Sequence, residues 1–132
     1  MTIKAATGQL AAVREFIAKR AEEFGFNEKQ ISDIRLAVDE ACTNIIKHAY
    51  DYDESKKVEI KTGYRNDRLW VSLSDTGEAF KPENYSKPDL RKQMKSRKRG
   101  GVGVYLIKKL MDEVEYSQEA DVNVIRMYKN RS

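Results

Sequence analysis

Two polar side chains lie one helical turn apart near the middle of the chain. Glu40 and Asn44 are four residues apart, so a helix places both on one face, and Lys47 continues the same polar edge. A carboxylate and a carboxamide offer the oxygen ligands that a hard cation such as Mg2+ takes in proteins. The carboxylate of Glu40 can also serve as a general base. An ordinary solvated helix face explains the same pattern, so both interpretations stay open at this point.

A second chemical signal is Ser74-Asp75-Thr76-Gly77, directly after an alternating apolar segment. An aspartate at the end of a strand can accept a hydrogen bond from a ligand amine, such as the exocyclic amine of adenine. Gly77 lets the backbone come close to a flat ring. Aspartate and glycine are also common turn residues, so a simple hairpin turn is the alternative interpretation.

The third signal is a group of glycines in front of an apolar helical stretch, in the order Arg99-Gly100-Gly101-Val102-Gly103. Backbone N–H groups at the start of a helix lie at the positive end of its dipole and can hold a phosphate. The group lacks the context of a dinucleotide-binding fingerprint, and it lacks the Gly-Lys-Ser/Thr of a P-loop. Taken alone, it indicates a phosphate cradle without identifying the nucleotide fold.

The elements that must position these residues begin with two helices. Apolar side chains recur at helical spacing over 10–24, and Gly25 suits the end of that helix. Asn27 with Gln30 three positions later predicts the capping box of a second helix, which runs to about Ala49. The apolar stripe of that second helix consists of Ile31, Ile34, Val38, Ala41, Cys42, Ile45 and Ala49.

Strands follow the two helices. Residues 58–62 and 69–73 alternate between apolar and polar side chains, and Asn66-Asp67 between them suits a hairpin turn. A helix over 102–111 comes next, and 114–116 and 122–128 read as closing strands. This order favours an α+β fold, a two-layer sandwich with helices on one face of a mainly antiparallel mixed sheet. We expect one domain over 1–132, without internal repeats.

Positive charge gathers in 81–99, a segment with two prolines and few apolar residues, which reads as a long loop. Eight cations against two carboxylates give it a net charge of +6, so the rest of a chain that totals +4 carries −2. Such a loop can neutralise a triphosphate, bind nucleic acid nonspecifically, or be merely solvated. A single aromatic residue in the segment gives little support for stacking of nucleic-acid bases.

Composition excludes several classes of protein. The 132 residues are 40% hydrophobic and 35% charged, which is typical of a globular domain with a polar surface. The longest apolar run, 102–107, is far shorter than the roughly 20 residues of a membrane helix. No signal-peptide core precedes Arg14. One cysteine and one histidine rule out an internal disulfide and leave little for a Cys/His metal site. We therefore expect a cytoplasmic protein that does not enter membranes.

The three motifs occur in the order E-x-x-x-N, D-x-G and G-x-G, and in this they resemble the histidine-kinase-like ATPase superfamily, also called GHKL. That superfamily uses the Bergerat ATP-binding fold. Within it, the sequence looks most like the small anti-sigma-factor serine/threonine kinases of bacteria. The matching segments are 36–50, 74–77 and 100–114, and the resemblance covers about residues 8–129.

The resemblance implies a role for the residues of the first two motifs. Asn44 would ligate the Mg2+ that bridges the phosphates of ATP. Glu40 would be the general base that takes the proton from the incoming serine hydroxyl. Asp75 would hydrogen-bond the adenine amine, with Gly77 beside the ring. Lys47 would lie at the phosphate edge or have a structural role.

The resemblance also assigns the glycine-rich segment and the loop before it. Gly101 and Gly103 would contact phosphate through their backbone amides, and the loop at about 81–99 would be the ATP lid. The other residues of this binding segment are Arg99, Gly100 and Val102.

One motif departs from the family pattern. The family's last motif usually has a glycine followed by a small polar residue on the final strand, the latter near adenine. Val122-Asn123 stands at that place here, so the glycine is missing and Asn123 is the residue that can hydrogen-bond.

The resemblance finally implies an activity and partners. The protein would be an ATP-dependent serine/threonine protein kinase and an anti-sigma factor. It would phosphorylate an anti-anti-sigma antagonist of the STAS type and sequester a sigma factor, and it would form a homodimer. Two other functions compete with this one. The first is a nucleotide-gated protein-binding module without kinase turnover, and the second is a basic nucleic-acid-binding protein.

Overall fold

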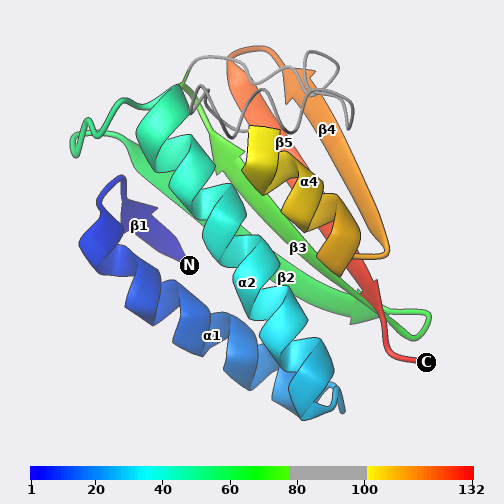
Figure 1. Cartoon of the computed structure of the whole chain (residues 1–132). Helices are drawn as coiled ribbons and strands as arrows, with labels where there is room; N and C mark the ends of the chain where they lie inside the picture. The colour runs from blue at the N-terminus through cyan, green and yellow to red at the C-terminus, as the bar shows by residue number, and fades with distance from the viewer. Residues whose placement is uncertain (78–100) are drawn as a thin grey trace.

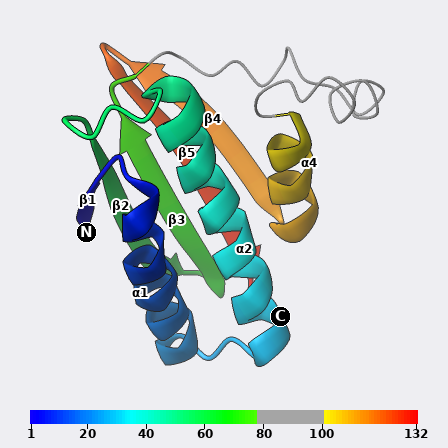
Figure 2. The ribbon, with the colours of Figure 1, turned by 60° about the vertical axis from the view of Figure 1, so that its left-hand side comes forward.

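The computed structural model describes residues 1–77 and 101–132. Their strands form one sheet in the order β1-β2-β3-β5-β4, and every pairing between neighbours is antiparallel. The helices α1, α2 and α4 cover one face of this sheet, and no helix of the described residues lies on the other face (Figures 1 and 2). The expected two-layer α+β sandwich is therefore confirmed, but within the described residues the sheet is antiparallel throughout and not mixed.

The first two helices follow the apolar pattern of the sequence. Helix α1 spans Leu10–Glu23 and helix α2 spans Glu28–Asn44. Asn27 caps α2 as predicted: its Oδ1 accepts from the backbone N–H of Gln30 at 2.8 Å, and its own N–H donates to the Gln30 side chain at 2.9 Å. The buried stripe of α2 faces the sheet and consists of Ile34, Ala37, Val38, Ala41 and Cys42.

The apolar spacing predicted an α-helix that runs to about Ala49, but the α-helical part of α2 ends at Asn44. Beyond Asn44 the chain widens into a π turn, η2 (Ile45–Ala49), closed by a hydrogen bond of 2.9 Å from the Tyr50 N–H to the Ile45 carbonyl. Five apolar or amphipathic residues fit either geometry, so periodicity could not reveal the change. Single π turns inside or at the end of α-helices often accompany functional sites.

The first long hairpin forms where the alternation predicted it. Strand β2 spans Lys57–Arg65 and strand β3 spans Arg68–Asp75, both longer than the alternating segments alone. Asn66 and Asp67 join them with φ values of 55° and 65°, the two left-handed residues of a tight hairpin turn. A short strand, β1 (Thr2–Lys4), pairs with β2 at the sheet edge and was not predicted, since three residues carry no recognisable alternation.

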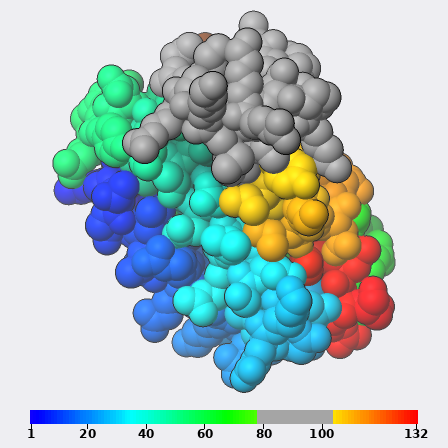
Figure 3. Space-filling model, viewed as in Figure 1, coloured from blue at the N-terminus to red at the C-terminus, as the bar shows by residue number. Residues whose placement is uncertain are grey.

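The C-terminal part of the chain supplies the remaining elements. Helix α4 spans Gly101–Leu110, one residue earlier at both ends than expected, and strands β4 (Glu113–Glu119) and β5 (Val122–Asn130) form the closing hairpin. A 3-10 turn, η1 (Thr7–Gln9), precedes α1. The surfaces of α1, α2 and α4 make up most of the described molecule on the helical side (Figure 3). The loop expected at 81–99 lies outside the described residues.

The end of the chain is held by the β2–β3 turn, in a contact that we call the C-terminal latch. The carboxylate of Asp67 accepts from the guanidinium of Arg131 at 2.7 Å and from the Tyr64 hydroxyl, also at 2.7 Å. The Ser132 hydroxyl donates to the same carboxylate. The side-chain amide of Gln30 donates to the Arg131 carbonyl at 2.8 Å, so the capping-box partner of Asn27 also holds the residue that follows β5.

No helix within residues 1–77 and 101–132 combines the length and the apolar character needed to cross a membrane.

Candidate functional site

The site begins with a buried carboxylate at the end of β3. Asp75 is 8% exposed and lies on the sheet face that the helices cover, next in line after the core residues Val71 and Leu73. Its Oδ1 accepts from the Gly77 N–H at 2.9 Å and from the Asn123 Nδ2 at 3.1 Å. Among the described residues, no donor reaches Oδ2. One carboxylate oxygen is thus fixed by the protein, and the other is left for a ligand.

Asn123 comes from the far end of the chain through strand pairing. It is the register partner of Asp75 across β3 and β5, although 48 residues separate them in sequence. Its Nδ2 also donates to the Gly77 carbonyl at 3.0 Å. Asp75, Gly77 and Asn123 therefore form one hydrogen-bonded cluster, which we call the aspartate cluster.

The surroundings of Asp75 change its acidity. Burial raises the pKa of Asp75 above its ordinary 3.8, because a charge loses hydration there. The hydrogen bonds from Asn123 and Gly77 act in the opposite direction and lower it by less. The carboxylate is therefore a strong hydrogen-bond acceptor that water only partly solvates, which suits recognition of an amine.

Gly77 lies against the π turn at the end of α2. A Cβ placed on Gly77 would come within 2.5 Å of the Ala49 carbonyl oxygen and 2.9 Å of the Ala49 side chain. Real Cβ atoms do not approach backbone this closely, so a glycine is required by packing as well as by the turn. The sequence predicted the glycine for closeness to a ligand, which stays a prediction, whereas the contact that the structure shows is with η2.

Tyr50 joins the same two elements and was missed as a site residue. Its buried hydroxyl accepts from the Thr76 N–H at 2.8 Å and donates to the Lys57 carbonyl at 2.7 Å. The residue that follows η2 thus fixes the backbone that carries Asp75 and Gly77. A buried tyrosine needs a partner for its hydroxyl, and this was the one signal that the sequence offered.

Glu40 and Asn44 lie one turn apart near the C-terminal end of α2, both half-buried, while Lys47 is exposed on η2. Within the part of the chain that the structure describes, the side chains of Glu40 and Asn44 have no hydrogen-bond partner. These two oxygen-bearing side chains, which no described residue occupies, lie on the helix that η2 connects to the aspartate cluster, and they are available to a ligand.

The start of α4 completes this end of the molecule. Helices α2 and α4 pack together and run antiparallel, so the Gly101 end of α4 points toward the end of the sheet where α2 and β3 finish (Figure 1). The first N–H groups of any helix lack intrahelical acceptors, and Gly101 and Gly103 belong to this first turn. The expected contributions of Arg99 and Gly100, and of the Val102 side chain, fall outside what the structure describes.

These elements together offer a defined chemistry. The site combines a hydrogen-bond acceptor for an amine at Asp75 with oxygen ligands for a cation at Glu40 and Asn44. The start of α4 adds backbone N–H groups that favour an anion. No group of three or more histidine, cysteine or acidic side chains that could hold a metal lies within residues 1–77 and 101–132. A cation here would depend largely on a phosphate ligand, which is how Mg2+ is commonly bound with nucleotides.

Comparison with known proteins identifies the family of this chain. The family model of the histidine kinase-like ATPase domain matches residues 3–129. The chain therefore belongs to the histidine kinase-like ATPase family, whose nucleotide is ATP.

The chain is also similar to individual serine-protein kinases. It is 32% identical over 128 residues to the serine-protein kinase RsbW of Bacillus subtilis (strain 168), covering 94% of this chain and 80% of that protein. It is 33% identical over 133 residues to the serine-protein kinase RsbW of Halalkalibacterium halodurans, covering 98% and 80%. The chain is thus a member of the family of these serine-protein kinases.

Solved structures confirm the fold. A Mycobacterium tuberculosis structure with RsbU and RsbW domains matches with a TM-score of 0.65 at 17% identity, over 98% of this chain and 31% of that one. The histidine kinase domain of a blue-light-activated histidine kinase from Erythrobacter litoralis matches with a TM-score of 0.60, also at 17% identity, over 98% and 62%. At this identity the likeness concerns the fold alone.

Proposed function

We propose that this chain, as a single ATPase domain over 1–132, is an ATP-dependent serine/threonine protein kinase that acts as an anti-sigma factor. The observation that carries the proposal is the aspartate cluster, where one oxygen of a buried carboxylate has no donor among the described residues. The cluster contacts η2, which continues the helix that carries Glu40 and Asn44. Kinship with the serine-protein kinases RsbW supports the transfer to serine.

Recognition of the base is assigned to the aspartate cluster. The Oδ2 of Asp75 accepts from the exocyclic amine of adenine, while Asn123 and the Gly77 N–H hold Oδ1. A hydrogen bond to a half-desolvated carboxylate is worth about 1.5–3 kcal/mol, which is enough to favour adenine over a base with a carbonyl at that position. Gly77 has no side chain, so the backbone there can lie close beside the adenine ring.

Binding of the phosphates is assigned to α2 and α4. The carboxamide oxygen of Asn44 is a hard donor without a partner in the described residues, and it fits Mg2+. The bound ion would neutralise charge that builds up on the phosphates during transfer. The N–H groups of Gly101 and Gly103, with Lys47 at the edge, favour the same anions; Arg99, Gly100 and Val102 are proposed members of the binding segment.

The chemical step is assigned to Glu40. Its carboxylate accepts the proton of a serine hydroxyl as the hydroxyl oxygen forms a bond to the γ-phosphorus of ATP. The bond from that phosphorus to its bridging oxygen breaks, and ADP leaves. Phosphoryl transfer depends on positioning and charge neutralisation more than on covalent help from the protein, so a single base placed one turn from Asn44 suffices.

The partners follow from the kinship. We propose a STAS-type anti-anti-sigma antagonist as the phosphorylated substrate and a sigma factor as the sequestered partner, with the kinase acting as a homodimer in the cytoplasm. Phosphorylation of the antagonist would leave the kinase free to hold the sigma factor.

The test uses Glu40→Gln with radiolabelled ATP, Mg2+ and candidate antagonist proteins. We expect the rate of label transfer to serine to fall at least about 100-fold, because the general base is lost. The affinity for ADP, measured by isothermal titration, should change less than about threefold. Glu22→Gln, an exposed glutamate on α1, is the matched control and should transfer label normally. Tight ADP binding without transfer to any antagonist would overturn the kinase assignment and leave a nucleotide-gated binding module.

A further inference from the structure

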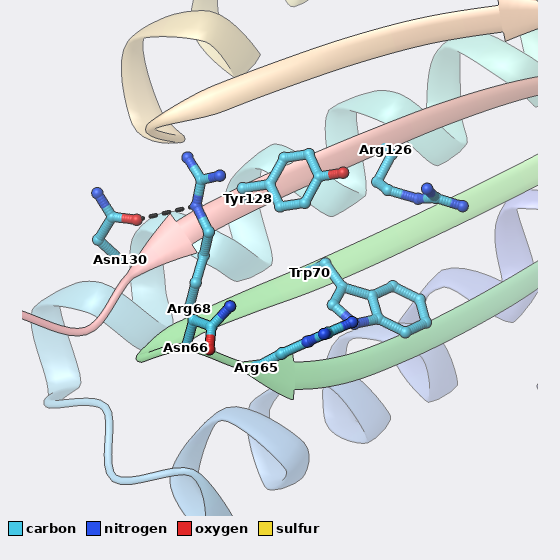
Figure 4. A pocket seen from close by; sticks show the side chains of 7 residues that line it. All are labelled: Arg65, Asn66, Arg68, Trp70, Arg126, Tyr128 and Asn130. Atoms are coloured by element: carbon cyan, nitrogen blue, oxygen red, sulfur yellow. Dashed lines mark hydrogen bonds between the residues drawn. The ribbon is translucent and has the colours of Figure 1, made fainter.

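The sheet face without helices carries a second feature, a shallow depression of about 620 Å3 near the β2–β3 turn (Figure 4). We call it the arginine patch, and its lining residues are Arg65, Asn66, Arg68, Trp70, Arg126, Tyr128 and Asn130. Asn66 lies in the β2–β3 turn, and the other six come from three adjacent strands, β2, β3 and β5. Large aromatic and cationic side chains on an open sheet face require an explanation that the nucleotide site does not give.

The patch is an ordered arrangement of rings and guanidinium groups. Trp70 and Tyr128 are direct register partners across β3 and β5. The guanidinium of Arg126 lies over the Trp70 ring at 5.7 Å, and that of Arg68 lies over the Tyr128 ring at 4.5 Å. Beneath the indole is Gly63, where a Cβ would come within 2.6 Å of the Trp70 ring. The Trp70 ring is therefore packed against the backbone of Gly63, and a guanidinium lies over each of the two rings.

The three arginines differ in how their charge is used. Arg68 donates to Glu113 at 3.1 Å and to the Asn130 side chain at 3.0 Å. Arg65 and Arg126 are exposed, and neither has a carboxylate partner among the residues that the structure describes. A guanidinium stacked on a ring keeps its N–H groups in the plane of the stack, ready for a carboxylate. The guanidinium of Arg126, stacked on Trp70, and that of Arg65, which lies over no ring among the described residues, thus remain open to an anion.

We propose that the arginine patch docks an acidic segment of a partner protein, with at least two carboxylates that pair with Arg65 and Arg126. The depression is open, and Arg65 and Arg126 are exposed, which suits a protein surface better than an enclosed small molecule. Since both rings carry a guanidinium, they are poor platforms for stacking of nucleic-acid bases.

The edge of the patch limits the size of the anion. Strand β4 places Glu113, Glu115 and Glu119 on the same sheet face, beside the outward residues of β5. A nucleic-acid backbone that crossed from β5 onto β4 would meet those carboxylates, of which Glu115 is the register partner of Arg126. A short acidic segment can instead lie over β3 and reach Arg65 and Arg126 from that side. The charge pattern therefore favours a few carboxylates over a long polyanion.

The patch is separate from the candidate nucleotide site. Arg68 opens β3 and Asp75 ends it, about 23 Å apart at the usual rise of a strand, and their side chains point to opposite faces of the sheet. Binding at the patch does not require ATP, so the proposal stands independently of the kinase assignment.

Trp70 makes the test local, because it is the only tryptophan in the chain. The experiment titrates an acetylated, amidated octaglutamate peptide into the full chain at low ionic strength and follows Trp70 fluorescence. We expect a saturable change that salt reverses and that a saturating concentration of ADP does not alter. Arg65→Gln and Arg126→Gln should each weaken the apparent affinity about fivefold, the value of one exposed ion pair of about 1 kcal/mol.

Matched controls separate the patch from general charge effects. Lys19→Gln and Arg35→Gln remove exposed cations from the helical side and should leave the titration unchanged. Equal affinity in the patch variants and these controls would overturn the proposal. A saturable response to a ten-residue oligo-dT that abolishes the peptide response would overturn it in favour of nucleic acid. Sedimentation showing that Arg126→Gln turns a dimer into a monomer, with peptide affinity unchanged, would make the patch an interface between copies instead.

Discussion

At the scale of single residues, Asp75 lies in an environment that disfavours the charged form of its carboxyl group. Its carboxylate is 8% exposed, and burial raises its pKa although Asn123 and Gly77 donate to it. A neutral amide could keep both internal hydrogen bonds without the loss of hydration. Retaining a buried charge at this position fits a carboxylate needed for binding rather than for folding.

We predict that Asp75→Asn weakens ADP–Mg2+ binding at least about tenfold, because an amide is a poorer acceptor for an amine than a charged carboxylate. Isothermal titration measures the affinity. The variant should be at least as stable as the wild type at pH 7, as measured by urea unfolding. The folded pKa of Asp75 is raised above 3.8, so its carboxyl group costs no stability below pH 3.8. The cost develops as the pH rises above 3.8 and is complete above the folded pKa.

The stability difference between Asp75→Asn and the wild type should therefore vanish near pH 3.5 and grow toward neutrality. A variant that is less stable than the wild type at pH 7, or equal heats of ADP binding for both proteins, would contradict this account of Asp75.

Sequence alone reached part of this site. Glu40 with Asn44, and Asp75 with Gly77, were predictable because each pair is close in sequence and its spacing has a direct geometric meaning. The contact between Asp75 and Asn123 depends on β3 pairing with β5, which no local pattern specifies. Tyr50 was missed for a related reason, since its role lies in a hydroxyl that bonds to two distant backbone groups.

At the scale of elements, the π turn η2 and the end of β3 are locked together. Gly77 lies against Ala49, and Tyr50 bonds to Thr76, so the helix with Glu40 and Asn44 and the strand with Asp75 have one fixed relation. The two long helices and the hairpins were predictable from periodicity and capping. The π turn was not, because packing against a neighbouring loop selects it.

We predict that Gly77→Ala lowers the free energy of unfolding by about 1–3 kcal/mol, the usual cost of an added methyl in a tightly packed place. It should also weaken ADP binding, because η2 and the Asp75 turn must move apart. Urea unfolding and isothermal titration measure the two effects. Gly8→Ala is the control, since a Cβ there has no neighbour within 4 Å, and it should be neutral in both assays. Wild-type behaviour of Gly77→Ala would show that the contact with Ala49 yields without cost.

At the scale of the whole molecule, the C-terminal latch makes stability sensitive to acid. Hydrogen bonds from Ser132, Tyr64 and Arg131 lower the pKa of Asp67 to about 2. A lowered aspartate pKa contributes stability that is fully present above the ordinary 3.8 and is lost as pH falls toward 2. Titration of Asp67 and of Asp75 therefore changes stability in opposite directions as the pH falls.

We predict that Asp67→Asn is less stable than the wild type at pH 6, and that the two converge between pH 4 and pH 2. The physical reason is that the amide keeps the shape of the latch but loses its charge-assisted bonds. Urea midpoints across this range measure the effect, with Asp121→Asn, an exposed aspartate in the β4–β5 turn, as the control. A constant gap down to pH 2 would show that the charge of Asp67 is not what holds the latch.

The order of the strands has a kinetic consequence. The part with α1, α2, β2 and β3 meets the part with α4, β4 and β5 along the β3–β5 pairing and the α2–α4 contact. Asp75 and Asn123 stand on opposite sides of that seam, 48 residues apart. The two halves must dock before any nucleotide can be recognised, so a ligand arrives too late to speed folding. Once bound, the nucleotide contacts both halves, so it should slow unfolding and lengthen the lifetime of the folded chain.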